Sequence, residues 1–242
     1  MDNKVKQNGK DWRRWSYILL MISVIEFLIL SSLAMFFYPG GTNADADTSG
    51  YDLFLNYFSD LGRFIAFNGE RNQVSFWLFN ISLIIFGISS AVYFVALREF
   101  FQDSIKEQKY SKLGTMMGVV SGCCLSCVGF LPDDILHDIH VNLTVLGFAL
   151  AFFTALAYIA AISFSERVPK KMARVFMIFI VAFAVYFVVL AVEFIISLSY
   201  EGDTRANPLG LAIIATGQKC VVYTWLVCFL LLGYYSLKLS HS

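Results

Sequence analysis

Charged residues are scarce in this sequence, and several long stretches have almost none. Asp, Glu, Lys and Arg make up 15% of the 242 residues, whereas a soluble domain usually carries about 25%. Hydrophobic residues reach 58%. The continuous apolar runs exclude an ordinary soluble domain and favour an integral membrane protein.

Other absences exclude further classes of protein. The formal net charge is zero and we find no nucleic-acid-binding motif, so we expect no nucleic-acid partner. The five cysteines do not form a disulfide framework. The apolar runs also lack the segments of about 10 residues with alternating polarity that are typical of membrane β-barrels. The remaining class is a bundle of membrane-spanning helices.

Six apolar runs are long enough to cross a bilayer as helices. A helix rises about 1.5 Å per residue, so roughly 20 residues cover a hydrocarbon core of about 30 Å. We therefore predict one all-α, polytopic membrane domain that covers residues 1–242. The predicted spans are residues 15–38, 75–100, 113–131, 141–164, 173–198 and 208–237.

The distribution of basic residues predicts the orientation of these spans. Five Lys and Arg precede the first span. Four lie in the connection between the second and third spans and its flanks, four lie in the connection between the fourth and fifth and its flanks, and Lys238 follows the sixth. The alternate connections hold only Arg63, Arg71 and Arg205. Because basic residues concentrate on the cytoplasmic side, we predict that both termini lie inside the cell. We expect the plasma membrane as the location.

The first outer connection contains a segment with helical periodicity. Asp52, Asn56, Ser59, Asp60 and Arg63 share one face if residues 51–63 form a helix. We predict a short amphipathic helix that lies on the outer membrane surface or folds over the mouth of the bundle. The alternative is an interfacial helix whose polar face only contacts water.

The connection before the fourth span holds two of the three histidines. A helix that begins near Pro132 places Asp133, His137 and His140 on one face, with Asp134 beside them. Two imidazoles and a carboxylate can bind a divalent metal or act as an acid–base pair. The alternative is a hydrated helix end without a site.

Three ionisable residues lie inside predicted spans. Glu26 and Lys219 have similar calculated depths, and Glu193 lies nearer the outer surface. We predict an intramembrane ion pair between Glu26 and Lys219, with Glu193 within reach of the lysine. Such a pair either fixes the register of the helices or belongs to a proton or ion relay. Asn80 and Asn142 add polar groups near the level of the histidines.

Small residues accompany three cysteines in the third span. Cys123, Cys124 and Cys127 lie there among glycine and serine residues. A metal or redox site is one interpretation. Small residues also let membrane helices approach closely, and we favour that interpretation.

Three motifs carry a resemblance to a known group of proteins. They are Tyr38-Pro-Gly-Gly41, Asn56-Tyr-Phe-Ser-Asp-Leu-Gly62, and Gly129-Phe-Leu-Pro-Asp133 followed by His137 and His140. The chain resembles an uncharacterised prokaryotic membrane-protein family grouped with the Frag/DRAM/Sfk-like six-helix proteins. That group includes eukaryotic factors that remodel glycosylphosphatidylinositol lipids. The resemblance implies a six-helix bundle and lipid binding or lipid-linked chemistry.

We expect an outward-facing polar site that binds or processes membrane lipids in the outer leaflet, in the manner of a hydrolase or an acyltransferase. A bound divalent metal would polarise the reacting group. The alternatives are an ion-coupled transporter that uses Glu26, Glu193 and Lys219, and a non-catalytic scaffold or sensor. The predicted catalytic residues are Asp60, Asp133, His137 and His140, the substrate-binding residues are Asn56, Ser59, Arg63, Asn80 and Asn142, and the metal ligands are Asp133, His137 and His140.

Overall fold

A computed structural model describes residues 2–199 and 208–241, and within these ranges the chain forms six long α-helices and no β-strand. Each helix is long and apolar enough to cross a membrane. The protein is therefore an all-α, multi-pass membrane protein. The helices are α1 (Asp2–Phe37), α2 (Gln73–Leu97), α3 (Ile105–Val128), α4 (His137–Phe164), α5 (Lys170–Ser199) and α6 (Pro208–Leu239), with the short 3-10 helices η1 (Ser59–Gly62) and η2 (Arg98–Phe100).

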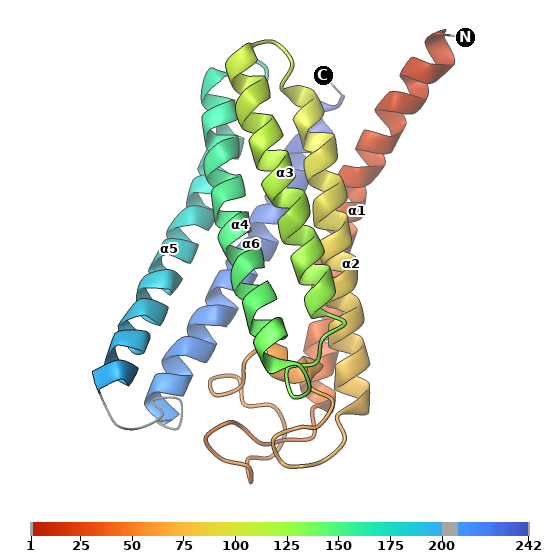
Figure 1. Ribbon diagram of the computed structural model, residues 1–242. Coiled ribbons are helices and arrows are strands. Elements are labelled where there is room, and N and C mark those ends of the chain that lie inside the picture. The colour runs from red at the N-terminus through yellow and green to blue at the C-terminus, as the bar shows by residue number, and fades with distance from the viewer. Residues whose placement is uncertain (1, 200–207, 242) are drawn as a thin grey trace.

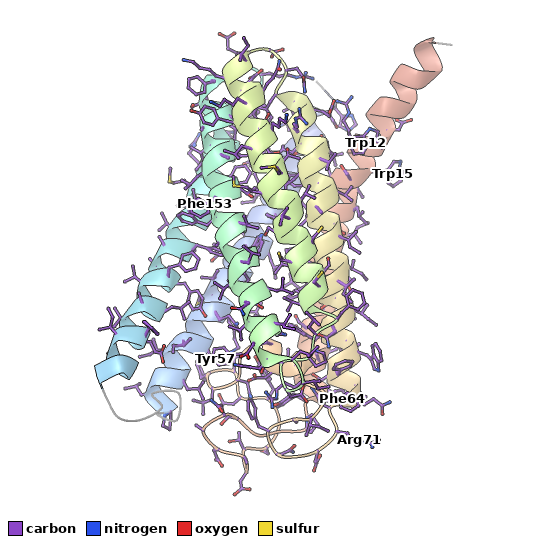
Figure 2. The ribbon with its side chains drawn as sticks, viewed as in Figure 1. Trp12, Trp15, Tyr57, Phe64, Arg71 and Phe153 are labelled. Atoms are coloured by element: carbon purple, nitrogen blue, oxygen red, sulfur yellow. The ribbon has the colours of Figure 1, made fainter. Side chains whose placement is uncertain are left out.

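Consecutive helices run in opposite directions, and both chain ends lie at the same end of the bundle (Figure 1). The connection between α1 and α2, residues 38–72, covers the opposite end, which we call the loop end. Trp12 and Trp15 project from α1 on the side of the chain ends (Figure 2), where 42% and 67% of their surfaces are exposed. Tryptophan is enriched at membrane–water interfaces, so this position fits a helix that emerges from a bilayer.

The prediction of six membrane-spanning helices is confirmed, but several helix boundaries differ from the predicted spans, among them the starts of the third and fourth helices. The third helix begins at Ile105, because Ser104 and Glu107 form a capping box in which Ser104 Oγ accepts the Glu107 N–H at 3.2 Å. The fourth helix was predicted to begin near Pro132 and begins at His137. The carbonyl of Pro132 accepts the N–H of Leu136 at 2.9 Å and closes a turn ahead of the helix.

Small residues hold α2 against α3. A Cβ atom added to Gly87 would stand 2.4 Å from Ser126 Oγ, and one added to Gly122 would stand 2.5 Å from the carbonyl oxygen of Gly87. Neither position leaves room for a side chain. The interpretation of the small residues in the third span as a packing face is therefore confirmed.

The predicted amphipathic helix over residues 51–63 is wrong. Turns occupy residues 53–55 and only Ser59–Gly62 is helical, as a 3-10 turn. Asp52 Oδ1 accepts the backbone N–H groups of Phe54 at 2.8 Å and Leu55 at 2.9 Å. These bonds resemble those of a helix N-cap, but the N–H groups of Tyr57 and Phe58 donate to Asp60 Oδ2 and Gln218 Oε1 instead of to the carbonyl groups of a helix. The segment therefore turns inward toward the bundle.

Candidate functional site

Asn56 and Asp60 form a buried polar centre in the connection at the loop end. Asn56 Nδ2 donates to Asp60 Oδ2 at 3.0 Å and to the Gly41 carbonyl at 3.0 Å, and Asp60 Oδ2 also accepts the Tyr57 N–H at 2.8 Å. Burial raises the pKa of Asp60 to about 6, because the charged carboxylate loses its hydration. These bonds all end within residues 41–60, so the two side chains stabilise the connection.

Two adjacent residues of α6 fasten this connection to the bundle. Lys219 Nζ donates to the carbonyl oxygens of Asn56 and, at 3.3 Å, of Ala215. The neighbouring Gln218 Oε1 accepts the Phe58 N–H at 2.9 Å. The ammonium group is buried and satisfied by carbonyl oxygens, which places Lys219 at the loop end of the bundle.

The structure does not form the predicted ion pair between Glu26 and Lys219. The two carboxylate oxygens of Glu26 are buried on α1, and neither has a hydrogen-bond partner among the described residues. Lys219 extends instead toward residues 38–72, where its ammonium group donates to the Asn56 carbonyl oxygen. Glu193 lies in the part of α5 near the loop end and is partly exposed.

A second polar group joins the two connections that cover the loop end. Arg63 Nη1 lies 3.0 Å from Asp133 Oδ2, and Asp133 Oδ1 lies 2.9 Å from His137 Nδ1. The carboxylate of Asp134 accepts the backbone N–H groups of residues 64–65 at 2.9 and 2.8 Å. We call Arg63, Asp133, Asp134 and His137 the loop clasp, because their contacts hold residues 38–72 against the start of α4.

His140 points away from the loop clasp. Its Nδ1 atom lies 2.6 Å from the Leu131 carbonyl oxygen, and 5% of the residue is exposed. A carbonyl can only accept a hydrogen bond, so Nδ1 carries a proton and a neutral ring keeps its lone pair on Nε2. The side chain of His137, in contrast, is 57% exposed. The two histidines therefore have different partners and different surroundings.

The predicted metal site is not assembled. Within residues 2–199 and 208–241, no group of three His, Cys, Asp or Glu side chains is placed to hold a metal ion. Asp133 binds Arg63 and His137, while His140 bonds to the backbone. Asp133 and His137 contact each other, but His140 bonds to the Leu131 carbonyl oxygen and does not join them as a third ligand.

A cavity of about 60 Å³ lies inside the bundle at the loop end. Side chains from α1, α2, α3, α4 and α6 line it, together with Phe58 and Ser59 of the connection. Eleven of the fifteen lining side chains are apolar, and six of these are Phe or Trp. The polar lining residues are Ser59, His140, Thr144 and Gln218.

The four polar lining residues gather toward the loop end of the cavity. His140 and Thr144 lie in the first turns of α4, and Thr144 Oγ1 donates to the His140 carbonyl at 2.8 Å. Gln218 precedes the apolar lining residues of α6 along that helix. The four polar residues thus lie at the end of the cavity beside residues 58–59, while almost all of the surface that faces the cavity is apolar.

The predicted site residues are divided between structural and cavity positions. Ser59 and His140 line the cavity, whereas Asn80 Nδ2 donates to the Gly62 carbonyl at 3.3 Å and supports the connection. Asn142 is exposed on α4. Thr144 and Gln218 were not predicted as site residues. Gln218 carried a usable signal, because it is an uncharged amide inside a long apolar run.

Residues 14–232 match the family described as "Protein of unknown function (DUF998)". The chain belongs to this family. The match extends from the first turns of α1 into the last turns of α6, so it covers nearly the whole bundle of the DUF998 protein. No curated protein and no solved structure matches the chain.

Proposed function

We propose that this DUF998 protein binds an amphipathic lipid-like molecule inside its helix bundle. The apolar chain of the ligand occupies the cavity, and its polar end meets Ser59, His140, Thr144 and Gln218. The observation that carries this proposal is a cavity inside the bundle with an almost wholly apolar surface, whose few polar lining residues all lie at its loop end. Ligand sites of this type combine a mostly apolar lining with a few polar groups that fix orientation.

The dimensions of the cavity favour a single narrow chain. The α6 lining runs from Gln218 to Leu226, which corresponds to about 12 Å along the helix axis. One water-sized group needs roughly 10–15 Å³, so about 60 Å³ holds about five such groups. A long and narrow space of this volume suits one alkyl or isoprenoid chain and excludes a whole two-chain phospholipid.

The lining also favours a ligand with an uncharged polar end. Of the described residues, no Asp, Glu, Lys or Arg lines the cavity. A charged group buried there would lose its hydration without gaining an opposite charge. His140 and Gln218 offer hydrogen bonds to a hydroxyl or a carbonyl group.

Binding is better supported than turnover or ion-coupled transport. Asp60 and Asp133, two of the predicted catalytic residues, do not line the cavity and are engaged in the connections. The proposed carrier residue Lys219 is likewise bound to backbone carbonyl groups. The resemblance to the Frag/DRAM/Sfk-like proteins supports a lipid ligand by analogy, and we place the site in the outer leaflet of the plasma membrane.

A cavity-filling substitution tests this proposal. Val222→Phe adds a ring to a lining position of α6, so we expect at least a tenfold loss of bound hexanol. The alcohol is presented to the purified full-length protein in detergent micelles, and adducts are counted by native mass spectrometry. Hexanol serves as the probe because it joins one short alkyl chain to an uncharged hydroxyl group.

The matched control places the same substitution on the lipid-facing surface. Val185 of α5 is 60% exposed, and Val185→Phe should leave the number of hexanol adducts unchanged. Equal adduct counts in the wild type and in both variants would show that hexanol binds outside the cavity. That result would refute the proposed function.

A further inference from the structure

Trp225 stands between two cavities of the bundle. A second cavity, of about 10 Å³, lies farther from the loop end and is lined by residues of α2, α4, α5 and α6. Among the described residues, Trp225 is the only one that lines both cavities. The indole ring therefore occupies the position where the apolar interior of the first cavity would otherwise continue into the second.

Aromatic rings hold the indole in this position. The Trp225 ring lies 5.9 Å from Phe86 of α2, 5.6 Å from Phe148 of α4 and 5.4 Å from Phe179 of α5, with interplanar angles of 76°, 74° and 68°. Edge-to-face contacts of this kind are favourable. Side chains from three neighbouring helices thus fix the orientation of one residue on α6.

The polar atom of this residue is not used by the fold. Trp225 Nε1 is buried and has no hydrogen-bond partner among the described residues. Buried indole N–H groups usually find an acceptor, and aromatic faces are weak acceptors. The large side chain is thus retained at the junction without the hydrogen bond that normally accompanies its burial.

We propose that Trp225 limits the length of the apolar chain that the protein accepts. This inference rests on the proposed function and specifies its ligand class: single-chain molecules whose chain ends at the indole ring. From Gln218 to Trp225 the helix axis advances about 10 Å, and from Trp225 to Leu232, at the far side of the second cavity, about 10 Å more. Removing the indole would join the second cavity to the first and let a longer chain extend past this position.

The test uses an equimolar mixture of straight-chain alcohols from hexanol to octadecanol. Each full-length variant in identical micelles receives this mixture, and native mass spectrometry gives the relative occupancy for each chain length. Because the mixture and the micelles are the same, differences between variants report on the protein. We expect a decline in wild-type occupancy beyond a certain chain length. Trp225→Ala should move this cut-off to longer chains. The occupancy of chains longer than the wild-type cut-off should rise at least tenfold.

Three further variants make the result specific. Trp225→Leu keeps more of the packing than alanine and should give a smaller shift in the same direction, which covers the case in which Trp225→Ala fails to fold. Trp77→Ala removes a tryptophan that is 57% exposed on α2 and should leave the profile unchanged. Adding Ala155→Phe to Trp225→Ala refills the second cavity and should restore the wild-type cut-off.

The outcomes separate this inference from the proposed function. A wild-type profile without a cut-off, or a cut-off that neither Trp225 variant moves, would overturn the length limit. If Val222→Phe still abolishes binding in that case, the proposed function stands. If Val222→Phe leaves every alcohol bound as in the wild type, the proposed function fails, and the length limit fails with it.

Discussion

Asp60 is a carboxylic acid in a site that favours its neutral form, and this makes the stability of the protein depend on pH. Its pKa rises from 3.8 to about 6 because burial removes hydration from the charged form. Between these values the folded protein binds more protons than the unfolded chain, so stability falls as the pH rises. A shift of this size corresponds to roughly 3 kcal/mol.

The prediction for this residue concerns Asp60→Asn. The amide keeps an oxygen acceptor for the Tyr57 N–H and cannot ionise. In the wild type, Asp60 should lower the melting temperature as the pH rises from 4 to 6. The variant should not show this decline. Thermal unfolding in detergent at several pH values measures this slope. Asp47→Asn, at an exposed position of the same connection, should retain the wild-type slope. Identical slopes for Asp60→Asn and the wild type would contradict the prediction.

The two histidines show what the sequence could predict about individual residues. Their occurrence together at one helix end predicted polar groups near the start of α4, and His140 does line the cavity. Their separate partners could not be predicted, because His137 meets Asp133 in a turn and His140 meets the Leu131 carbonyl. Both contacts depend on the turn formed by residues 132–136, which the helical periodicity of the sequence does not reveal.

At the scale of elements, the loop clasp connects segments that are distant in sequence. The carboxylate of Asp134 is the acceptor for two backbone N–H groups of residues 64–65. Asp134→Ala should therefore leave both groups without this acceptor and lower the free energy of unfolding by about 1 kcal/mol. We also expect faster proteolysis within residues 38–72, measured by limited digestion.

The control for the loop clasp is Glu70→Ala, at an exposed position of the same connection. It removes a carboxylate without touching the acceptors of residues 64–65. Equal digestion rates and melting temperatures for Asp134→Ala and Glu70→Ala would show that the loop clasp does not hold the two connections together.

The helices were predictable from the sequence, whereas the connection at the loop end was not. Span length depends on local composition, so six apolar runs sufficed to predict six helices. The segment 51–63 has equally clear helical periodicity, but the N–H groups of Tyr57 and Phe58 bond to the side chains of Asp60 and Gln218 instead of to helix carbonyl groups. Its buried form also needs Gln218 and Lys219, which are distant in sequence.

At the scale of the whole molecule, both chain termini lie at one end of the bundle and the cavity lies at the other. Both termini lie at one end, and residues 38–72 cover the other (Figure 1). The basic residues of the α2–α3 and α4–α5 connections lie on the same side as the termini. The positive-inside rule therefore predicts that the loop end faces the outside of the cell, and with it the cavity of the proposed lipid site.

Cysteine labelling tests this orientation. In a background with the five native cysteines replaced by alanine, Asp47→Cys should react with a membrane-impermeant maleimide on intact cells. Lys109→Cys, exposed near the start of α3, should react only after permeabilisation. The two positions serve as controls for each other, because both are exposed and lie at opposite ends of the bundle. The reverse pattern would place the cavity in the inner leaflet, and the ligand would then have to come from the cytoplasmic side.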